Sequence, residues 1–359
     1  MRLKQCIFAL VAMLLCAFSA NAQGGSVAKI GSTEYTTFAD AMAAANAATG
    51  NVNVEVYGAV EFIDGMELNG SYTAITFTGK SAEAKITINQ TAGGDYLTAH
   101  GKTVAFNDLI LAKANPAWSG NSGHMGNYFS IQGGTVTYTY CTFPNGACTN
   151  TGTAVYNNCT FQNSAEYGLW VYDDALVTVN GGTIDSKKGI KVYSEGEQDV
   201  TSTLTVQNAT FTENVTAKPA VAVGYAQSIT LKGNTYNNPT AHVELDSGSD
   251  ADCEGITFVA QDSEGNDIAS TLEMTDRSNS SAPCGVLVDG KIYTTVTTAA
   301  AEATEGSTVT LLYNSTEEVE LPEGVVLDKN GYTANNVTVA TSGVAKVGEN
   351  VFTTVLEAL

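Results

Sequence analysis

Apolar and polar residues alternate with a period of two along short stretches of this chain, and Asn, Gly and Ser separate the stretches. In GLWVYD, Leu169 and Val171 face one way while Trp170 and Tyr172 face the other, as in a strand with one buried side. The same alternation occurs in GIKVYS, AVAVGY and HVELDS, and again in VTVNGGTI, LTVQNATF and ITLKGNTY. The pattern predicts many short β-strands between about residues 103 and 259.

A short motif recurs along these strands and ends in Thr followed by one large apolar residue. Its apolar residues are spaced by 18, 23, 27, 25 and 22 positions: Phe143, Phe161, Ile184, Phe211, Tyr236 and Phe258. Variable spacing around one value is expected when coils stack on one another and insertions lie in the outer loops. An antiparallel β-sandwich is the alternative, but its strands recur about every 8–12 residues with hairpin turns. The longer unit favours stacked coils.

These stretches resemble the right-handed parallel β-helix of the pectin-lyase-like superfamily over roughly residues 52–259. The resemblance implies a mainly β protein whose coils bury apolar side chains against the coils above and below. A short amphipathic helix precedes the coils, after a capping box of Thr37 and Asp40. Its apolar face has the spacing i, i+3, i+4 and i+7: Phe38, Ala41, Met42 and Ala45. We expect this helix to cap the stack, because an open end of parallel strands invites unwanted pairing.

A small module of strand, glycine turn, strand, helix and strand occurs twice and begins a third time. The first copy starts with VAKIGSTEYTTF at Val27, the second with GVLVDGKIYTTV at Gly285, and the third with VAKVGENVFTTV at Val344. An aromatic residue holds the same place in each copy: Tyr35, Tyr293 and Phe352. In the second copy the apolar helix face consists of Val296, Ala299, Ala300 and Ala303. The repetition predicts one local fold used three times.

A second motif, NGSYTA at 69–74 and NGYTA at 330–334, extends the match between the first two copies. The third copy reaches its capping pair, Thr354 and Glu357, and then stops, so we expect the final stub to be truncated or disordered. The chain therefore divides into a signal peptide (1–22), an N-terminal cap module (23–79), parallel β-helix coils (80–284), a C-terminal repeat of the cap module (285–340) and the start of a third module (341–359).

The first 22 residues have the pattern of a bacterial secretory signal. Arg2 and Lys4 precede an apolar run over 7–18, and Ala20-Asn21-Ala22 gives the cleavage pattern. A lipid anchor at Cys16 is the alternative, which the large residue before it disfavours. No later stretch contains the ~20 apolar residues that a membrane-spanning helix needs. We expect an exported protein that is extracellular, at the cell surface or periplasmic.

Charge and cysteine content exclude several classes of protein. The chain has 37 acidic and 16 basic residues and a formal charge of −21, which disfavours nucleic-acid binding. Five cysteines follow the signal peptide, and their spacing matches no zinc site: Cys141, Cys148, Cys159, Cys253 and Cys284. Cys141 and Cys159 hold equivalent places in neighbouring coils, so they could form a disulfide, with Cys148 in the intervening loop as a rival partner. Buried free thiols are the simpler interpretation.

The outward positions of the GLWVYD type of strand form a stripe when the coils are stacked. The stripe contains Ser130 and Gln132, Trp170 and Tyr172, Lys191 and Tyr193, Ala222 and Gly224, and Glu244 and Asp246. Aromatic rings beside carboxylates and amides suit the apolar faces and hydroxyl edges of sugars. The candidate ligand-binding residues are Trp170, Tyr172, Lys191, Tyr193, Glu195, Asp174, Glu244 and Asp246. A plain solvated exterior is the alternative.

The favoured function is non-catalytic glycan binding or adhesion, with a polysaccharide or surface glycan as partner. A polysaccharide lyase or hydrolase acting on an acidic polysaccharide is the second hypothesis, with Lys187, Lys188 and Lys191 as candidate bases. Asp173 and Asp174 are adjacent and form a poor pair of hydrolytic carboxylates. Convergence of Lys191, Glu195, Asp174 and Glu244 in one groove would favour catalysis. A purely structural repeat protein is the third hypothesis.

No cofactor is expected, and calcium is the one ion for which the sequence offers a candidate segment. The acids of ELDSGSDADCE carry oxygen ligands of the kind that calcium prefers: Asp246, Asp250, Asp252 and Glu254. Their spacing does not match the calcium loop of EF-hands, so an acidic solvent loop is the favoured interpretation.

Overall fold

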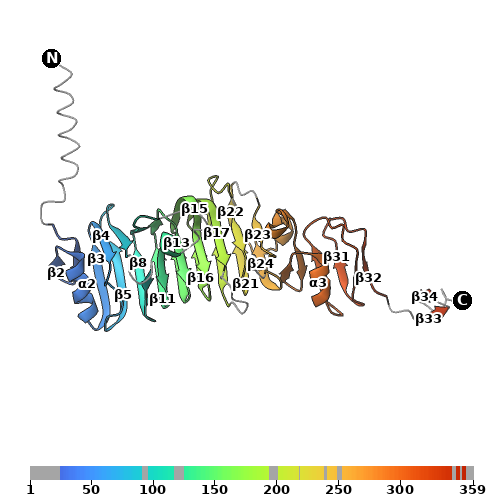
Figure 1. Cartoon of the computed structure of the whole chain (residues 1–359), viewed down its shortest axis with the longest axis horizontal. Helices are drawn as coiled ribbons and strands as arrows, with labels where there is room; N and C mark the ends of the chain where they lie inside the picture. The colour runs from blue at the N-terminus through green and yellow to red at the C-terminus, as the bar shows by residue number, and fades with distance from the viewer. Residues whose placement is uncertain are drawn as a thin grey trace, which may run out of the picture.

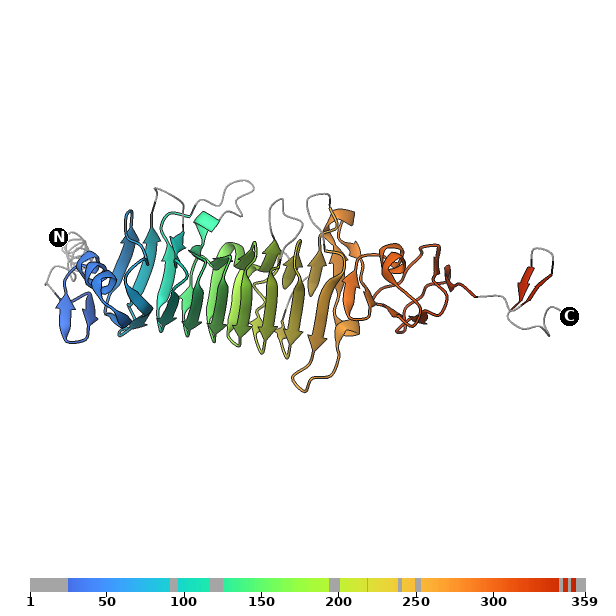
Figure 2. The ribbon, with the colours of Figure 1, turned by 90° about the horizontal axis from the view of Figure 1, so that it is seen from below.

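The protein is an elongated stack of short strands arranged along one axis (Figures 1 and 2). A computed structural model describes residues 25–90, 96–116, 125–193, 201–217, 219–237, 241–248, 253–341, 345–347 and 350–352. The predicted signal peptide, Glu195, Asp250, Asp252 and the third helix with Thr354 and Glu357 lie outside these ranges. Two long, mostly parallel sheets make up the stack, which confirms the predicted mainly β, parallel β-helix architecture.

The first sheet, called sheet A, forms one continuous face of the stack. Its strands follow one another in the order β2 (Thr33–Tyr35), β1 (Ala28–Ile30), β3 (Gly50–Val56), β5 (Tyr72–Gly79), β8 (Thr103–Asn107), β11 (Thr135–Thr139), β14 (Thr153–Asn157), β16 (Leu176–Asn180), β18 (Thr203–Gln207), β21 (Ser228–Lys232), β24 (Ile256–Gln261), β28 (Lys291–Tyr293), β27 (Val286–Val288), β29 (Thr308–Leu311) and β31 (Val326–Asp328). From β3 to β24 the neighbours are parallel and in register.

The second sheet divides into two faces because its long strands bend at a corner. The first of these, called face B, contains β4 (Ala59–Ile63), β6 (Lys85–Asn89), β9 (Ile110–Lys113), β12 (Thr142–Phe143), the first parts of β15 (Thr160–Tyr172) and β17 (Thr183–Tyr193), β19 (Thr210–Phe211) and β22 (Thr235–Tyr236). The other, called face C, contains β7 (Leu97–Thr98), β10 (Phe129–Gln132), β13 (Ala147–Asn150), the last parts of β15 and β17, β20 (Val221–Val223), β23 (Val243–Leu245), β25 (Met274–Asp276) and, antiparallel to it, β26 (Ala282–Pro283).

The corner after each sheet A strand explains the frequent Asn, Asp and Gly. Asp108, Asn158 and Asn208 adopt positive φ angles of 54°, 51° and 56° directly after their strands, and Gly181 and Gly233 occupy the same corner in other coils. Asn, Asp and Gly tolerate this left-handed conformation better than other residues. The corner turns the chain from sheet A to face B once per coil, which sets the period noted in the sequence.

Aromatic side chains form a continuous ladder inside the stack. The rings of Phe77, Phe106, Tyr138 and Tyr156 come from four consecutive strands of sheet A, with centroid distances of 5.2, 5.4 and 4.6 Å between neighbours. Five of the six residues that mark the period share one column of face B, from Phe143 to Tyr236. Phe258 does not, because its strand β24 pairs with β21 in sheet A. The sequence motif is thus repeated on two different faces.

The predicted N-terminal helix is present, with half of the predicted capping box; the Asp40 carboxylate accepts from the Thr37 hydroxyl at 2.6 Å. Helix α2 (Phe38–Ala47) begins after Thr37, whose side chain accepts a hydrogen bond from the Asp40 amide at 3.2 Å. All four predicted apolar residues are buried, and the Phe38 ring packs against Phe62 at 5.1 Å. Figure 1 shows α2 at the end of the stack, where it covers the first coil.

The module repeat is also confirmed, because the three hairpins have the same register. Ala28 pairs with Tyr35, Val286 with Tyr293, and Ala345 with Phe352, in the hairpins β1–β2, β27–β28 and β33–β34 (Ala345–Val347 and Asn350–Phe352). Helix α3 (Val296–Glu302) follows the second hairpin, and the parallel pairs β29–β31 and β30–β32 (Val319–Leu321 and Val337–Val339) follow α3. These pairs correspond to β3–β5 and β4–β6, so the second module begins a second stack of coils.

One part of the sequence match is wrong. NGSYTA leads into β5, whereas NGYTA lies in the turn between β31 and β32. The two segments therefore occupy different places in their modules. Three short 3₁₀ helices complete the described elements: Met125–Asn127, Ala269–Thr271 and Arg277–Asn279.

Glu317 anchors the second module at the N-terminus of α3. Its carboxylate accepts hydrogen bonds from the amides of Val296 and Thr297 at 3.1 and 2.9 Å, and from the Tyr313 hydroxyl. Burial alone would raise the pKa of Glu317, but these hydrogen bonds outweigh it and hold the pKa below the ordinary value of 4.5. The folded module therefore stabilises the ionised form of Glu317.

We expect Glu317→Gln to destabilise the second module by about 2 kcal/mol, because hydrogen bonds to a charged acceptor are lost. In the unmodified protein, this contribution should be complete above pH 4.5 and disappear as the pH falls through the lowered folded-state pKa. Hydrogen exchange of the amides in 286–311 would measure the change in stability of the second module. Glu318→Gln is the control, since Glu318 is the exposed neighbour. Equal effects of the two substitutions would contradict this role.

Candidate functional site

The predicted stripe lies on the outward side of face C. One column contains Ser130, Cys148, Trp170, Lys191, Ala222 and Glu244, and the next contains Gln132, Asn150, Tyr172, Tyr193, Gly224 and Asp246. The stripe has one more strand here than the sequence suggested, because β13 lies between β10 and β15. Cys148 is therefore in a strand and not in a loop. The strand ACTN has no large apolar residue, so alternation could not reveal it.

Trp170 is not on a solvated exterior. Its side chain is 5% exposed and packs with Tyr128 and Cys148 in a small cluster outside the main core. Tyr128 precedes β10 and meets the indole edge-on, with ring centroids 5.9 Å apart. Trp170 therefore cannot stack on a sugar in this arrangement. Tyr172 and Tyr193 are half-buried and keep part of their surface accessible.

Three aromatic rings surround the ammonium group of Lys191. Its Nζ lies 4.3 Å from the ring centroid of Tyr193, 4.6 Å from Trp170 and 5.8 Å from Tyr167. Cation–π attraction holds the charge over these rings. Among the described residues, no carboxylate forms an ion pair with Lys191. Within the described ranges its N–H donors therefore have no anionic acceptor.

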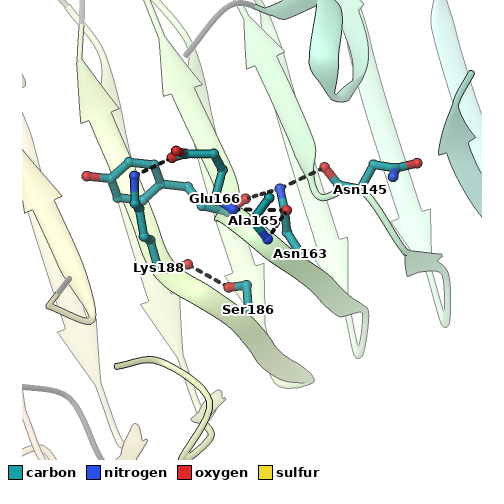
Figure 3. Close-up of polar contacts among 7 residues, drawn as sticks. Asn145, Asn163, Ala165, Glu166, Ser186 and Lys188 are labelled. Atoms are coloured by element: carbon teal, nitrogen blue, oxygen red, sulfur yellow. Dashed lines mark hydrogen bonds and ion pairs between the residues drawn. The ribbon is translucent and has the colours of Figure 1, made fainter. Parts of the chain in front are cut away.

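The corner between face B and face C positions Tyr167, which the sequence did not single out. Figure 3 shows Asn163 at this corner, where its side chain donates to the carbonyls of Asn145 and Tyr167 at 3.1 and 3.0 Å. Its Oδ1 accepts from the amide of Glu166 at 3.0 Å, and the Glu166 carboxylate binds Lys188 Nζ at 2.6 Å. This buried network fixes the bend in β15 and directs Tyr167 outward, beneath Lys188 and Lys191.

Arg277 belongs to the site, although it is not among the candidate residues named from the sequence. Strand β25 pairs with β23, so Arg277 follows the residue opposite Leu245 and reaches Asp246. Its guanidinium donates to Asp246 Oδ2 at 2.7 Å and is 52% exposed. The other oxygen of Asp246 accepts from the Ser278 hydroxyl and the Gly248 amide. The sequence MTD at 274–276 alternates in the same way as HVELDS and lies one coil further on. This alternation could have located Arg277, the next residue.

A shallow depression with a volume of only about 10 Å³, open to solvent, joins these residues. Lys191 and Tyr193 form one wall, and Glu244, Asp246 and Arg277 form the other. The two walls are two strands apart, or roughly 9.6 Å. The coil between them contributes Ala222 and Gly224, which leave space. A β-carbon at position 224 would lie 2.4 Å from the Tyr193 ring, so glycine lets that ring lie flat across the strand.

Burial is the main cause that lowers the pKa of Lys191 to about 8, and the nearby Arg277 charge lowers it further. The Asp246 carboxylate has the opposite effect and raises the pKa of Lys191. Burial also raises the pKa of Tyr167. At neutral pH the pocket therefore presents a charged but readily deprotonated amine beside a permanently charged guanidinium.

The pocket brings together four of the eight predicted site residues: Lys191, Tyr193, Glu244 and Asp246. Trp170 and Tyr172 are adjacent to it in the stack, and Glu195 lies outside the described residues. Asp174 is separate, at the exposed turn after β15, where it accepts from the amide and hydroxyl of Thr201 at 3.0 Å each. The convergence that would favour catalysis is thus incomplete.

The thiols and acids of the described chain form no evident metal site. All five cysteines in the described ranges are buried and free. No group of three or more His, Cys, Asp or Glu in the described ranges is placed to hold a metal ion. Of the candidate calcium ligands, Asp246 binds Arg277 and Glu254 accepts from the Thr294 amide at 2.9 Å.

No protein family, curated protein or solved structure matches this chain. Within the part of the chain that is described, no helix is long and apolar enough to cross a membrane.

Proposed function

We propose that this chain is an exported β-helix protein of the pectin-lyase-like type that binds a glycan on face C without catalysis. The observation that carries the proposal is the pocket around Lys191. Two cationic side chains, Lys191 and Arg277, meet there; within the described ranges Lys191 has no carboxylate partner, and Asp246 is already occupied by Arg277, Ser278 and Gly248. The ligand should therefore supply acceptor oxygens, as sugar hydroxyls and carboxylates do.

The shape of the site suits part of a long chain more than a small free ligand. Pockets that enclose small molecules usually have volumes of about 300–1,000 Å³. The depression around Lys191 has about 10 Å³, so a ligand would lie across the outer surface of the strands, as a stretch of a polysaccharide can. Half-buried Tyr172 and Tyr193 lie in adjacent coils and extend the surface with aromatic groups.

A polysaccharide lyase is the second candidate, because of the lowered pKa of Lys191. A neutral Lys191 amine could take the proton next to the carboxylate of an acidic sugar, while Arg277 neutralises that carboxylate. The electron pair from the broken C–H bond would form a double bond as the glycosidic oxygen leaves. The proton for that oxygen would come from the Lys191 ammonium formed in this step or from the hydroxyl of Tyr167, which also lines the pocket.

A glycan array containing neutral and acidic polysaccharides, combined with assays for reducing ends and for the ultraviolet absorbance of unsaturated sugars, tests the proposal. We expect binding without product. Unsaturated product from an acidic polysaccharide would establish the lyase instead. Binding to no glycan would refute the proposal and leave a structural role.

A further inference from the structure

The outward residue pair of each hairpin determines whether the module ends a stack or joins two stacks. In the first hairpin this pair is Lys29 and Glu34, which face solvent at the N-terminal end of sheet A. In the second hairpin the equivalent pair is Leu287 and Ile292. Ile292 is 1% exposed, and both residues pack against the main core of the coils.

The second hairpin thereby seals the C-terminal end of the first stack. Strand β28 pairs antiparallel with β24, the last coil strand of sheet A, and Ile292 lies opposite the buried Ile256. The alternate side of the same hairpin, formed by Val286, Val288 and Tyr293, belongs to the core of the second module. An apolar outward pair thus allows one hairpin to close one stack and open the next.

The second stack ends without such a seal. Strand β31 is the last strand of sheet A, and no described strand pairs with its outer edge. Val326 is 57% exposed at this edge, while Leu327 points inward beside Val309. An exposed strand edge with apolar residues favours the addition of another strand.

We propose that the third hairpin of this chain, β33–β34, seals the second stack by antiparallel pairing of β34 with β31. In the third hairpin this pair is Lys346 and Val351. Lys346 matches Lys29 of the first hairpin, whereas Val351, on the strand that would contact β31, holds the place of Ile292, where the first hairpin has Glu34. The register of the β24–β28 junction then places Val351 opposite Leu327 and Asn350 opposite Asp328. The distance along the chain suits this contact, since 22 residues separate Asp328 from Val351 and 34 separate Thr257 from Ile292.

Hydrogen exchange of the full chain tests this contact. We expect slow exchange of the Leu327 amide, which points away from β29, and at least tenfold faster exchange of this amide in Val351→Glu, which introduces the residue of the solvent-facing hairpin. Val351→Ile should keep the protection, and Lys346→Glu, on the far strand of the hairpin, should change it little. Fast exchange of the Leu327 amide in the unmodified chain, or equal exchange of it in all three variants, would overturn the proposal. Protection that rises with protein concentration would also overturn it, because a second copy would then be the occupant.

Discussion

Lys191→Met should weaken glycan binding at least tenfold and leave the β-helix folded. Methionine fills the space between the rings of Trp170, Tyr167 and Tyr193 but supplies neither charge nor N–H donors. A tenfold loss corresponds to about 1.4 kcal/mol, which is modest for a charge-assisted hydrogen bond in a partly buried site. Calorimetric titration with the glycan identified on the array would measure the loss.

Lys188→Met is the matched control, because Lys188 pairs with Glu166 at the corner and does not line the pocket. It should change affinity by less than the pocket variant does. If both substitutions weaken binding equally, a general loss of positive charge is responsible and the assignment of the pocket is wrong.

The pH dependence of binding gives a second test of Lys191. Its pKa of about 8 is below the ordinary value of 10.5, so binding that needs the ammonium should be full below pH 7 and fall as the pH passes through 8. Between pH 8 and 10.5 the unfolded chain binds more protons at this residue than the folded chain does, so the free energy of unfolding should rise with pH there. Lys191→Met should remove both trends. A flat binding curve through pH 8 would refute the role of the ammonium.

Tyr138→Ala is expected to destabilise the stack by about 3–5 kcal/mol, as losses of large buried aromatic side chains do. The Tyr138 ring is 1% exposed and lies between Phe106 and Tyr156 in the aromatic ladder, at 5.4 and 4.6 Å. Removing it interrupts the ladder and leaves a cavity that neighbouring coils cannot fill without moving. Chemical denaturation followed by circular dichroism would measure the change.

Tyr140→Asn provides the control two residues later. Tyr140 is 61% exposed and adopts a φ of 52° at the corner where other coils have Asp108 and Asn158. Asparagine tolerates this conformation, so the free energy of unfolding should change by less than about 0.5 kcal/mol. Comparable losses for the two tyrosines would show that the chain does not stack its coils as described.

The fold could be predicted because its local rules repeat in every coil. Period-two alternation located the strands, and Asn, Asp and Gly at the positive-φ corners set the period. The Thr37 cap and the apolar face of α2 follow from helix geometry alone. Strand β13 was missed because Ala147–Asn150 lacks large apolar residues, and its coil is held by in-register pairing with both neighbours.

The site could be predicted only in part, because its burial depends on groups far away in sequence. Alternation correctly placed Lys191, Tyr193, Glu244 and Asp246 on one surface. It could not show that Tyr128 covers Trp170, or that a bend at Asn163 directs Tyr167 into the site. Arg277 reaches the pocket through one further coil, 31 residues after Asp246 in the sequence.

Hydrogen-exchange footprinting of the intact protein with its bound glycan is the most direct test of the account. We expect added protection in the outward parts of face C, within 167–172, 188–193 and 273–278, and none on the strands of sheet A. Protection confined to sheet A, or an unchanged exchange pattern at a saturating glycan concentration, would contradict the placement of the binding site around Lys191.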